Sequence, residues 1–325
     1  MTPGAPITVL LSTYNGQRYL PELLDSLWQQ TLQDFVLRVR DDGSTDETLT
    51  LLSAAQKTRP GQIELVRDGY ARLRPMRSFV ELMKGAETPY VAFCDQDDVW
   101  LPNKLARLVQ AIQAAEAEIG RDRPILCCSD AVVTDANLRQ LHPSYHRRHN
   151  LMLTNGRDML LQRLLFRNFA IGATTMVNAA LVQRCLDVPD AAVMHDWWMA
   201  LVATAMGRAI VLPEPLMLYR QHGANAVGSH AKAFPRNRAE FFSHLNWARR
   251  SSANCLKQAA AFQATHRGEL PPQQASLLQA FSTFSQLGPL QRLATLLRLR
   301  AFKPGIALNS LHLLSCMTAE IDAPT

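Results

Sequence analysis

Short apolar runs alternate with stretches of helical periodicity over the first 130 residues, and this alternation limits the folds open to the chain. Between the runs, apolar residues recur at helical spacing, as Leu20, Leu23 and Leu27 do after Pro21. Strands that alternate with helices form right-handed crossovers and a parallel sheet covered on both faces. The apolar runs expected to form strands are Ile7–Ser12, Phe35–Arg40, Ile63–Arg67, Tyr90–Cys94 and Ile125–Ser129.

The pattern changes after about Leu151, where helices and strands no longer alternate regularly. From about Ala231 onward the chain is expected to be helical, with breaks at two proline-containing pairs, 271–272 and 288–289. The elements expected in the second half are helix Arg157–Leu165, strand Ala173–Val177, helix Asp196–Met206, and strands Ala209–Leu212 and Leu216–Arg220.

The charge balance narrows the choice of partners. The 325 residues are 47% hydrophobic, enough for a sizeable core, and 34 basic residues face 28 acidic ones. This mild positive excess suits a phosphorylated substrate or an anionic lipid surface as readily as nucleic acid. The basic residues are dispersed and form no aromatic-basic platform, so no nucleic-acid partner is expected.

The cysteines and the N-terminus indicate a compartment. Six cysteines show no CxxC spacing and lie mostly in apolar runs, which predicts reduced, structural thiols. The N-terminus shows no basic region followed by a long apolar core, and no segment approaches the ~18 apolar residues of a membrane span. We therefore expect a cytoplasmic protein, soluble or peripheral at the inner face of the membrane.

Three carboxylates follow the fourth apolar run, where Asp95, Asp97 and Asp98 occur within four positions. Close carboxylates repel one another unless a cation lies between them, and their hard oxygen atoms suit Mg²⁺ or Mn²⁺. A divalent ion that keeps open coordination positions is well matched to a diphosphate. The alternative is that Asp97 or Asp98 caps the helix that Pro102 announces.

Three loops are candidates for a ligand site, because ligands gather beyond the carboxyl ends of parallel strands. These loops are Thr13–Gly16, Asp41–Asp46 and Asp95–Asp98; all are polar, and two are rich in carboxylates. In the second loop, Ser44 and Glu47 are spaced as a capping box for the helix that follows.

Several motifs, taken in their order along the chain, resemble the inverting family 2 glycosyltransferases of the GT-A fold. The resemblance covers Ile7 to about Gly228. It implies an α/β fold of the GT-A type, with a mostly parallel central sheet and a helical C-terminal tail. The motifs are Ser12-Thr13-Tyr14-Asn15-Gly16, Asp41-Asp42-Gly43-Ser44-Thr45-Asp46, Asp95-Gln96-Asp97, His195-Asp196-Trp197-Trp198 and Tyr219-Arg220-Gln221-His222-Gly223.

The same resemblance implies a division of the chain. Residues 1–130 would form the half that binds the nucleotide-sugar donor. Residues 131–230 would form the acceptor-binding and catalytic half of the same domain, and residues 231–325 a helical extension.

For the sugar-nucleotide donor, the resemblance places Thr13, Tyr14 and Asn15 in the opening nucleotide loop. It also implies that Asp42 binds the base of the nucleotide. A tight turn and a capped helix start are the structural alternatives for these two loops.

The resemblance also assigns roles to the acidic motif. Asp95 would meet the ribose and Gln96 would join it in the donor site, while Asp97 would bind Mg²⁺ or Mn²⁺. His222 would be a second metal ligand. A lone histidine is more often structural, and only its position after a second-half strand favours this role.

On the acceptor side, Asp196 would be the general base that takes the proton of the acceptor hydroxyl. Its alternative is an Asp that merely faces a helix dipole. Trp197 and Trp198 would line the acceptor pocket, because an aromatic face packs on a sugar ring, or would be core anchors.

The sequences DQDDVW, HDWW and YRQHG together are most similar to the bacterial rhamnosyltransferase branch. This implies dTDP-rhamnose as donor and a glycan or lipid-linked glycan of a surface polysaccharide as acceptor. Family members often place Asn before the residue that corresponds to Phe79, whereas this chain has Arg77-Ser78; Arg77 would contact the diphosphate or be incidental.

Two other functions fit parts of the sequence. Asp95-Gln96-Asp97-Asp98-Val99 also resembles the signature of haloacid-dehalogenase-type phosphatases, with Asp95 as nucleophile, although about four strands precede it here. A non-catalytic sugar-nucleotide or glycan-binding protein is the second alternative, and the presence of both Asp97 and Asp196 argues against it.

The C-terminal tail carries one more pattern. A helix that starts at Pro289 places Leu290, Leu293 and Leu297 on one face, with basic residues nearby. This composition fits a helix at a membrane surface, and it also fits an amphipathic helix packed on the catalytic domain.

Overall fold

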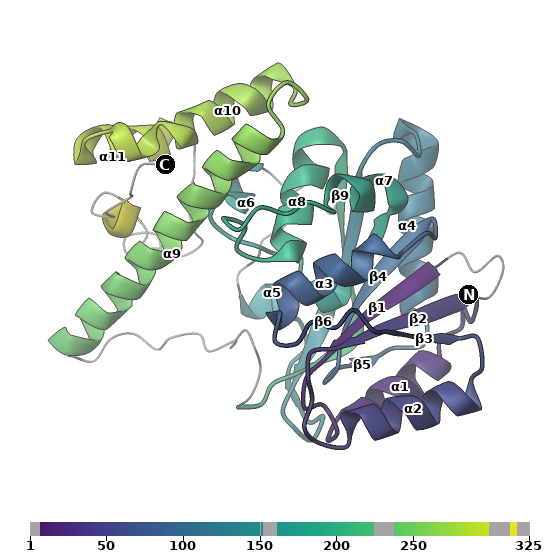
Figure 1. Ribbon diagram of the computed structural model, residues 1–325. Coiled ribbons are helices and arrows are strands. Elements are labelled where there is room, and N and C mark those ends of the chain that lie inside the picture. The colour runs from purple at the N-terminus through teal and green to yellow at the C-terminus, as the bar shows by residue number, and fades with distance from the viewer. Residues whose placement is uncertain (1–6, 150, 152–160, 224–236, 299–312, 317–325) are drawn as a thin grey trace.

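The computed structural model describes residues 7–149, 151, 161–223, 237–298 and 313–316 (Figure 1). Within this part of the chain, nine strands form one sheet in the order β3-β2-β1-β4-β8-β6-β9-β5, with β7 paired to β6. The strands are β1 Ile7–Thr13, β2 Phe35–Asp41, β3 Ile63–Val66, β4 Tyr90–Asp95, β5 Val99–Trp100, β6 Ile125–Thr134, β7 Gln140–His142, β8 Thr175–Asn178 and β9 Arg208–Arg220.

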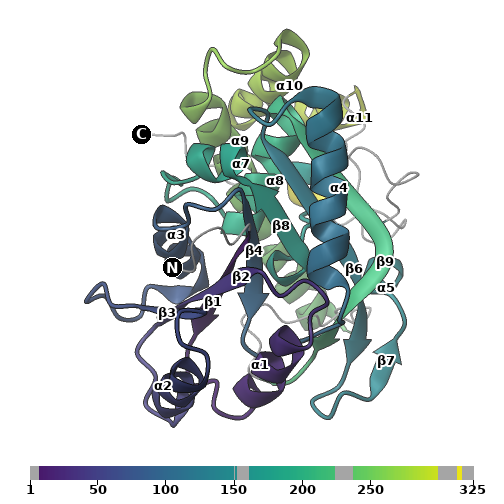
Figure 2. The same ribbon diagram turned by 90° about the vertical axis from the view of Figure 1, so that its right-hand side faces the viewer.

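Helices cover both faces of this sheet. Figure 1 shows α1 and α2 on one side and α3 and α8 on the other, and Figure 2 shows α4 lying across β6 and β8. The helices are α1 Leu20–Trp28, α2 Thr48–Thr58, α3 Arg74–Lys84, α4 Lys104–Ile119, α5 Tyr145–Arg148, α6 Leu161–Leu164, η2 Gly172–Thr174, α7 Ala179–Arg184, α8 His195–Met206, α9 Arg238–Thr265, α10 Pro272–Ser282, η3 Phe284–Gln286 and α11 Pro289–Arg298.

The N-terminal half forms the expected parallel sheet. β1 lies between β2 and β4, β3 extends the sheet beyond β2, and all three pairings are parallel. Successive side chains of β1 enter opposite cores: Leu10 packs with α3, whereas Val9 and Leu11 pack with α1, α2 and α4. Burial on both faces explains the unbroken apolar run that predicted this strand.

In the second half, β8 runs antiparallel to β4 and β6, and β9 runs parallel to β6. The two strands expected at Ala209–Leu212 and Leu216–Arg220 are one long strand, β9. Its pairing with β6 shifts register after Ser129, opposite Pro213–Pro215, because proline cannot donate to the ladder and favours a bulge. β6 crosses residue 130, so the two expected halves share one sheet.

Two predictions of helix N-caps from local sequence were wrong. α2 begins at Thr48 with Glu47 in the N-cap position, so Ser44 does not form the expected capping box. Asn103 precedes α4, which excludes Asp97 and Asp98 as its caps. Helix Arg157–Leu165 is represented by α6, and its first four residues lie outside the described residues. All six cysteines are buried, as expected.

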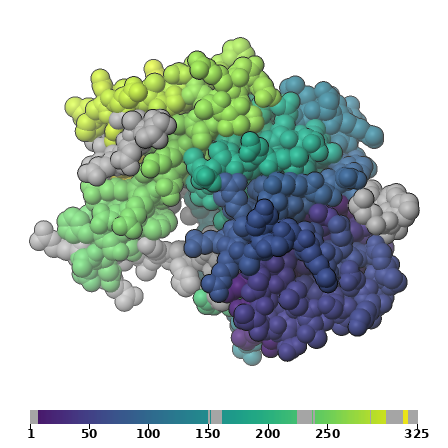
Figure 3. Space-filling view, viewed as in Figure 1, coloured from purple at the N-terminus to yellow at the C-terminus, as the bar shows by residue number. Residues whose placement is uncertain are grey.

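The C-terminal helices pack against the second half of the described chain. Cys255, Leu256, Ala259 and Phe262 of α9 belong to the same hydrophobic core as α8. In the space-filling view, the green and yellow atoms of α9, α10 and α11 form one side of the molecule (Figure 3). Among the described residues, none of the helices has the length and apolar character needed to cross a bilayer.

Candidate active site

The three candidate loops meet at the carboxyl edge of the parallel strands. The Gln96 side chain accepts a hydrogen bond from the Tyr14 backbone N–H and donates one to the Tyr14 carbonyl, both at 2.9 Å. Asn15 Oδ1 accepts from the Thr45 N–H at 2.8 Å, and the Asn15 N–H donates to Ser44 Oγ at 2.8 Å. The first loop is therefore tied to the other two, as the strand-end rule predicts.

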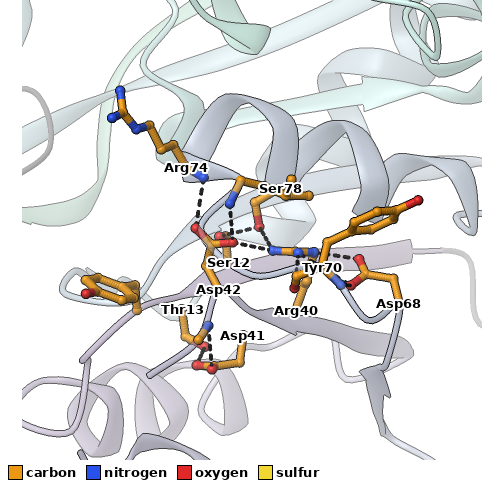
Figure 4. A network of polar contacts seen from close by, with 12 residues as sticks. Ser12, Thr13, Arg40, Asp41, Asp42, Asp68, Tyr70, Arg74 and Ser78 are labelled. Carbon is orange, nitrogen blue, oxygen red and sulfur yellow. Dashed lines mark hydrogen bonds and ion pairs between the residues drawn. The ribbon is translucent and has the colours of Figure 1, made fainter. Parts of the chain in front are cut away.

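Asp42 braces the segment after β3 (Figure 4). Its carboxylate is buried and accepts three hydrogen bonds, from Arg40 at 2.7 Å, Leu73 N at 2.7 Å and Arg74 N at 2.8 Å. Arg72 and Arg74 both have positive φ angles, of 59° and 64°. Residues other than glycine seldom adopt this backbone conformation without such support. Since a carboxylate has about four acceptor positions, one remains for a ligand, and the base-binding role of Asp42 stays a prediction.

Asp41 lies on the other side of the strand end. It accepts hydrogen bonds from Thr13 Oγ1 and from the Ser44 N–H, both at 2.8 Å. A cavity of about 450 Å³ adjoins it between α2 and the segment after β3, with Gly43, Ser53 and Tyr70 in its wall. Thr13 therefore shapes the loop, and its contact with the donor stays a prediction.

Arg40 is the cation at the centre of this network, and the sequence analysis missed it. Its guanidinium is fully buried and donates to Asp42, to Asp68 at 2.7 Å and to the Tyr70 carbonyl at 2.8 Å (Figure 4). Burial alone would raise the pKa of Asp68, but the hydrogen bonds from Arg40 and Tyr70 N lower it. A charged residue inside an apolar strand run was the signal available.

The acidic motif meets the end of β9. Asp97 Oδ2 lies 2.8 Å from His222 Nε2, although 125 positions separate the two residues. Asp98 is buried and accepts from the Arg220 N–H at 2.9 Å, and Arg220 Nε donates to the Asp97 carbonyl at 2.7 Å. The structure thus unites the two motifs that the resemblance assigned to the metal.

Crowding changes the protonation of these carboxylates. Burial, and then the charges of Asp97 and Asp196, raise the pKa of Asp95 to about 7. Burial and the charges of Asp97 and Asp95 raise the pKa of Asp98 well above its ordinary value. The carboxylates therefore repel one another, as expected for a site that receives positive charge with its ligand.

Lys104 lies behind this cluster and is a second residue that sequence analysis missed. Its ammonium is fully buried, donates to the Ala173 carbonyl and lies 3.5 Å from the centre of the Trp100 ring. Burial lowers the pKa of Lys104 to about 7, whereas the charges of Cys94, Asp98 and Asp95 raise it. The charge of Lys104 lowers the pKa of Asp95 and of Asp98, and so partly offsets the acidic motif.

Asp196 lies in the first turn of α8 and faces the same space. It accepts hydrogen bonds from Asn168 Nδ2 at 3.0 Å, from Trp197 N at 2.6 Å and from Gly172 N at 2.8 Å. Burial raises the pKa of Asp196 to about 7, and the three hydrogen bonds oppose that shift. Its charge also contributes to the raised pKa of Asp95.

The expected acceptor-pocket role of Trp198 is wrong. Its side chain is fully buried and lies against Phe262 of α9, with ring centres 5.2 Å apart, because the C-terminal helices cover this face of α8. Trp197 is partly buried and donates its indole N–H to the Leu164 carbonyl at 2.6 Å; its contact with an acceptor stays a prediction.

Two neighbours of the site are structural. His195 is buried between Phe79 and Phe93, and burial lowers its pKa to about 3, so the ring remains neutral. Arg77 donates to the Val188 carbonyl at 2.9 Å and pairs with Asp190, which leaves it incidental to a diphosphate.

The side chains available as metal ligands partly fit a divalent cation. No group of three or more His, Cys, Asp or Glu side chains placed to hold a metal occurs among the described residues. Asp97 Oδ2 and His222 Nε2 nevertheless lie 2.8 Å from each other, so one oxygen and one nitrogen ligand are brought together. Mg²⁺ or Mn²⁺ held by two protein ligands keeps its other positions for water and substrate phosphate oxygens, so the pair fits the predicted metal.

Solved structures show what the fold is similar to. The structure of TarS residues 1–349 from S. aureus, in complex with UDP-GlcNAc, has a TM-score of 0.54 and 18% identity and covers 97% of this chain and 90% of its own. The mannosyltransferase PcManGT from Pyrobaculum calidifontis, with GDP-Man and Mn²⁺, has a TM-score of 0.58 and 18% identity and covers 97% and 86%. The fold is the GT-A fold of glycosyltransferases.

The family follows from the sequence match. Residues 8–168 match the model of the family described as Glycosyl transferase family 2, so the chain carries a domain of this family. The phosphatase alternative for Asp95 is thereby overturned.

Two curated relatives extend this match. The dTDP-rhamnosyl transferase RfbG of Shigella flexneri is 25% identical over 231 residues, which cover 68% of this chain and 74% of the relative. An uncharacterized glycosyltransferase of Nostoc is 34% identical over 110 residues. This match covers 34% of each protein, so the chain spans about a third of that relative's length.

We predict that Arg40→Met destabilises the protein far more than Arg107→Met does. Arg40 is 0% exposed, and its loss leaves Asp42 and Asp68 with uncompensated charge, at a cost of about 3–5 kcal/mol. Arg107 pairs with Glu214 at the surface, with both side chains more than a third exposed, so its removal should cost under about 1 kcal/mol. Urea unfolding of both variants measures the difference, and equal losses would contradict the role of Arg40.

Proposed function

We propose that the protein is a metal-dependent, inverting glycosyltransferase that moves L-rhamnose from dTDP-rhamnose to a hydroxyl group of a surface-polysaccharide or lipid-linked glycan. The observation that carries this proposal is the arrangement at one sheet edge. Asp97 lies 2.8 Å from His222, and the charges of Asp97 and of the hydrogen-bonded Asp196 both raise the pKa of Asp95, which lies at the end of β4. One edge therefore offers a place for a diphosphate and a base for an acceptor.

The chemistry needs two things from the chain. Asp97 and His222 would hold Mg²⁺ or Mn²⁺, which supplies positive charge for the departing diphosphate when bound. Asp196 would accept the proton of the acceptor hydroxyl as the new bond to the anomeric carbon forms and the bond to the diphosphate oxygen breaks. A base pKa of about 7 suits proton transfer near neutral pH. One displacement inverts the anomeric centre, without a covalent sugar–enzyme intermediate.

The choice of rhamnose is supported by sequence rather than by pocket geometry. RfbG, named as a dTDP-rhamnosyl transferase, aligns over 68% of this chain. The similar solved structures contain UDP-GlcNAc or GDP-Man with Mn²⁺, which supports a nucleotide-sugar donor and a divalent metal. The buried thiols fit a reducing compartment, and we place the reaction on the cytoplasmic side.

A donor panel tests the substrate and the metal together. We expect the highest kcat/KM for nucleotide diphosphate release with dTDP-rhamnose, compared with UDP-GlcNAc and GDP-mannose. Excess EDTA should lower it by about 100-fold, because the diphosphate then departs without a neutralising cation. Added Mn²⁺ or Mg²⁺ should restore activity. Full activity in EDTA would remove the metal from the mechanism, and exclusive use of another donor would remove rhamnose.

Substitutions of Asp196 and of Asp97 should affect turnover and donor binding differently. Asp196→Asn should lower kcat by about 10²–10⁴-fold with nearly unchanged donor affinity, because a base acts on the acceptor in the transition state. Asp97→Asn should weaken metal-dependent donor binding as well as turnover. Donor titration by calorimetry and steady-state kinetics separate the two effects. Near-normal turnover of Asp196→Asn would end its assignment as the base.

We also propose that α11 contacts an anionic membrane surface that carries a lipid-linked acceptor. The helix packs inward through Arg292 and Leu296, and it leaves Leu290 77% exposed and Leu297 51% exposed. Arg298 lies next to this apolar stripe and is exposed. Apolar burial and attraction to anionic lipid would both favour binding.

Vesicle sedimentation tests this contact. We expect Leu290→Glu/Leu297→Glu to bind vesicles with anionic lipid at least about tenfold more weakly than the unmodified protein, because two leucines lose their burial in lipid. Leu141→Glu in β7, at a residue of matched exposure (53%), is the control and should bind normally. Equal binding of all three proteins, or none by the unmodified protein, would contradict the proposal.

A further inference from the structure

We propose that Asn168 is a positioning residue that fixes the Asp196 carboxylate so that Oδ2, and not Oδ1, receives the proton of the acceptor hydroxyl. This inference rests on the proposed role of Asp196 as the general base. Asn168 lies in the segment between α6 and η2, 28 positions before Asp196.

The Asn168 amide is held rigidly before it reaches Asp196. Its Oδ1 accepts from the Ala170 N–H at 3.0 Å, and its Nδ2 donates to the Ala170 carbonyl at 3.0 Å. Both ends of the amide are thus fixed to the backbone of one residue. The second hydrogen of Nδ2 is then directed at Asp196 Oδ1, again at 3.0 Å. A group fixed in this way orients its partner at little further entropic cost.

The two oxygens of Asp196 are consequently unequal. Oδ1 accepts from both Asn168 Nδ2 and Trp197 N, whereas Oδ2 accepts from Gly172 N. A carboxylate oxygen has about two acceptor positions, so Oδ1 is saturated and Oδ2 keeps one. The lone pair available for an incoming hydroxyl therefore belongs to Oδ2.

Gly172 keeps this oxygen approachable. A Cβ at this position would lie 3.4 Å from Asp196 Oδ2 and 3.3 Å from His195 Nε2. Glycine thus allows its own N–H to approach the carboxylate closely without a side chain beside Oδ2.

The surroundings of Asp196 supply little positive charge to keep it ionised. The titratable groups that influence it or lie against it are Asp95 from β4, Cys128 from β6, Tyr145 from α5 and His195 from its own helix. None of these is a cation at neutral pH, because burial holds His195 neutral. The hydrogen bonds from Gly172 N and Trp197 N, and then that from Asn168, therefore oppose burial, and Asn168 is the one side chain among these donors that favours the charged form of Asp196.

Two variants and one control test the proposal through the pH dependence of kcat/KM. The base works when ionised, so kcat/KM rises with pH to a plateau. Asn168→Ala should move this rise to higher pH by about one unit, because one hydrogen bond to a charged group is lost. Activity at the pH midpoint of the unmodified enzyme should fall several-fold and largely recover on the plateau. Asn168→Asp keeps the shape but adds a repulsive charge, and should shift the rise further.

The control is Asn103→Ala, at an exposed asparagine before α4 that forms no side-chain cap, and its profile should match that of the unmodified enzyme. A loss that is uniform in pH for Asn168→Ala, or an unchanged profile, would overturn the proposal.

A second measurement does not depend on turnover. The ¹³C NMR signal of the Asp196 carboxyl, assigned by its absence in Asp196→Asn, should titrate about one pH unit higher in Asn168→Ala. An unchanged titration would overturn the positioning role. If Asp196→Asn instead retains full transfer, the proposed function of Asp196 fails while the NMR shift still reports the contact, so the two failures are distinguishable.

Discussion

Repulsion between carboxylates at the end of β4 is the constraint on which the rest of the site depends. Asp95, Asp97 and Asp98 stand within four residues, and the fold brings Asp196 close to them. The charge of buried Lys104 offsets part of this repulsion, and buried Arg220, which pairs with Glu22, holds the motif through hydrogen bonds. Lys104 lies behind the motif, and Arg220 clasps the Asp97 carbonyl while its N–H bonds to Asp98. A divalent cation bound under the proposed function would offset the negative charge that remains on these carboxylates.

The cations explain why distant elements must pack well for the site to form. Arg220 ends β9, and β9 reaches the acidic motif only because its pairing with β6 continues beyond the bulge at the prolines. Lys104 begins α4 and contacts Ala173 and Met217, which belong to the second half of the chain. The first and second halves of the described chain are therefore joined by contacts of Lys104 and Arg220 as well as by the shared sheet, and neither half is expected to form the site alone.

The sequence predicted those features that depend on short-range patterns. Apolar runs located the parallel strands, and the strand-end rule located all three loops that meet in the structure. It could not predict features that depend on packing between distant segments. The burial of Trp198 requires α9, which the sequence analysis treated as a separate tail. Ser44 has the spacing of a capping residue, but a carboxylate at Asp41 attracts its hydroxyl and amide more strongly.

The two sides of the site differ in how they are held, and this has a chemical consequence. On the proposed donor side, hydrogen bonds to backbone groups of Tyr14 and Thr45 join the loops, so several separate contacts hold them in place. On the proposed acceptor side, the Asp196 carboxylate accepts hydrogen bonds from a short segment, through the Asn168 side chain and the Gly172 backbone N–H. Since hydrogen bonds to a buried carboxylate govern its protonation, small changes in this segment alter when the base is ionised without disturbing the donor loops. Under the proposed function, the segment that holds Asp196 is thus where substitutions would change the pH dependence of transfer with least effect on the donor loops.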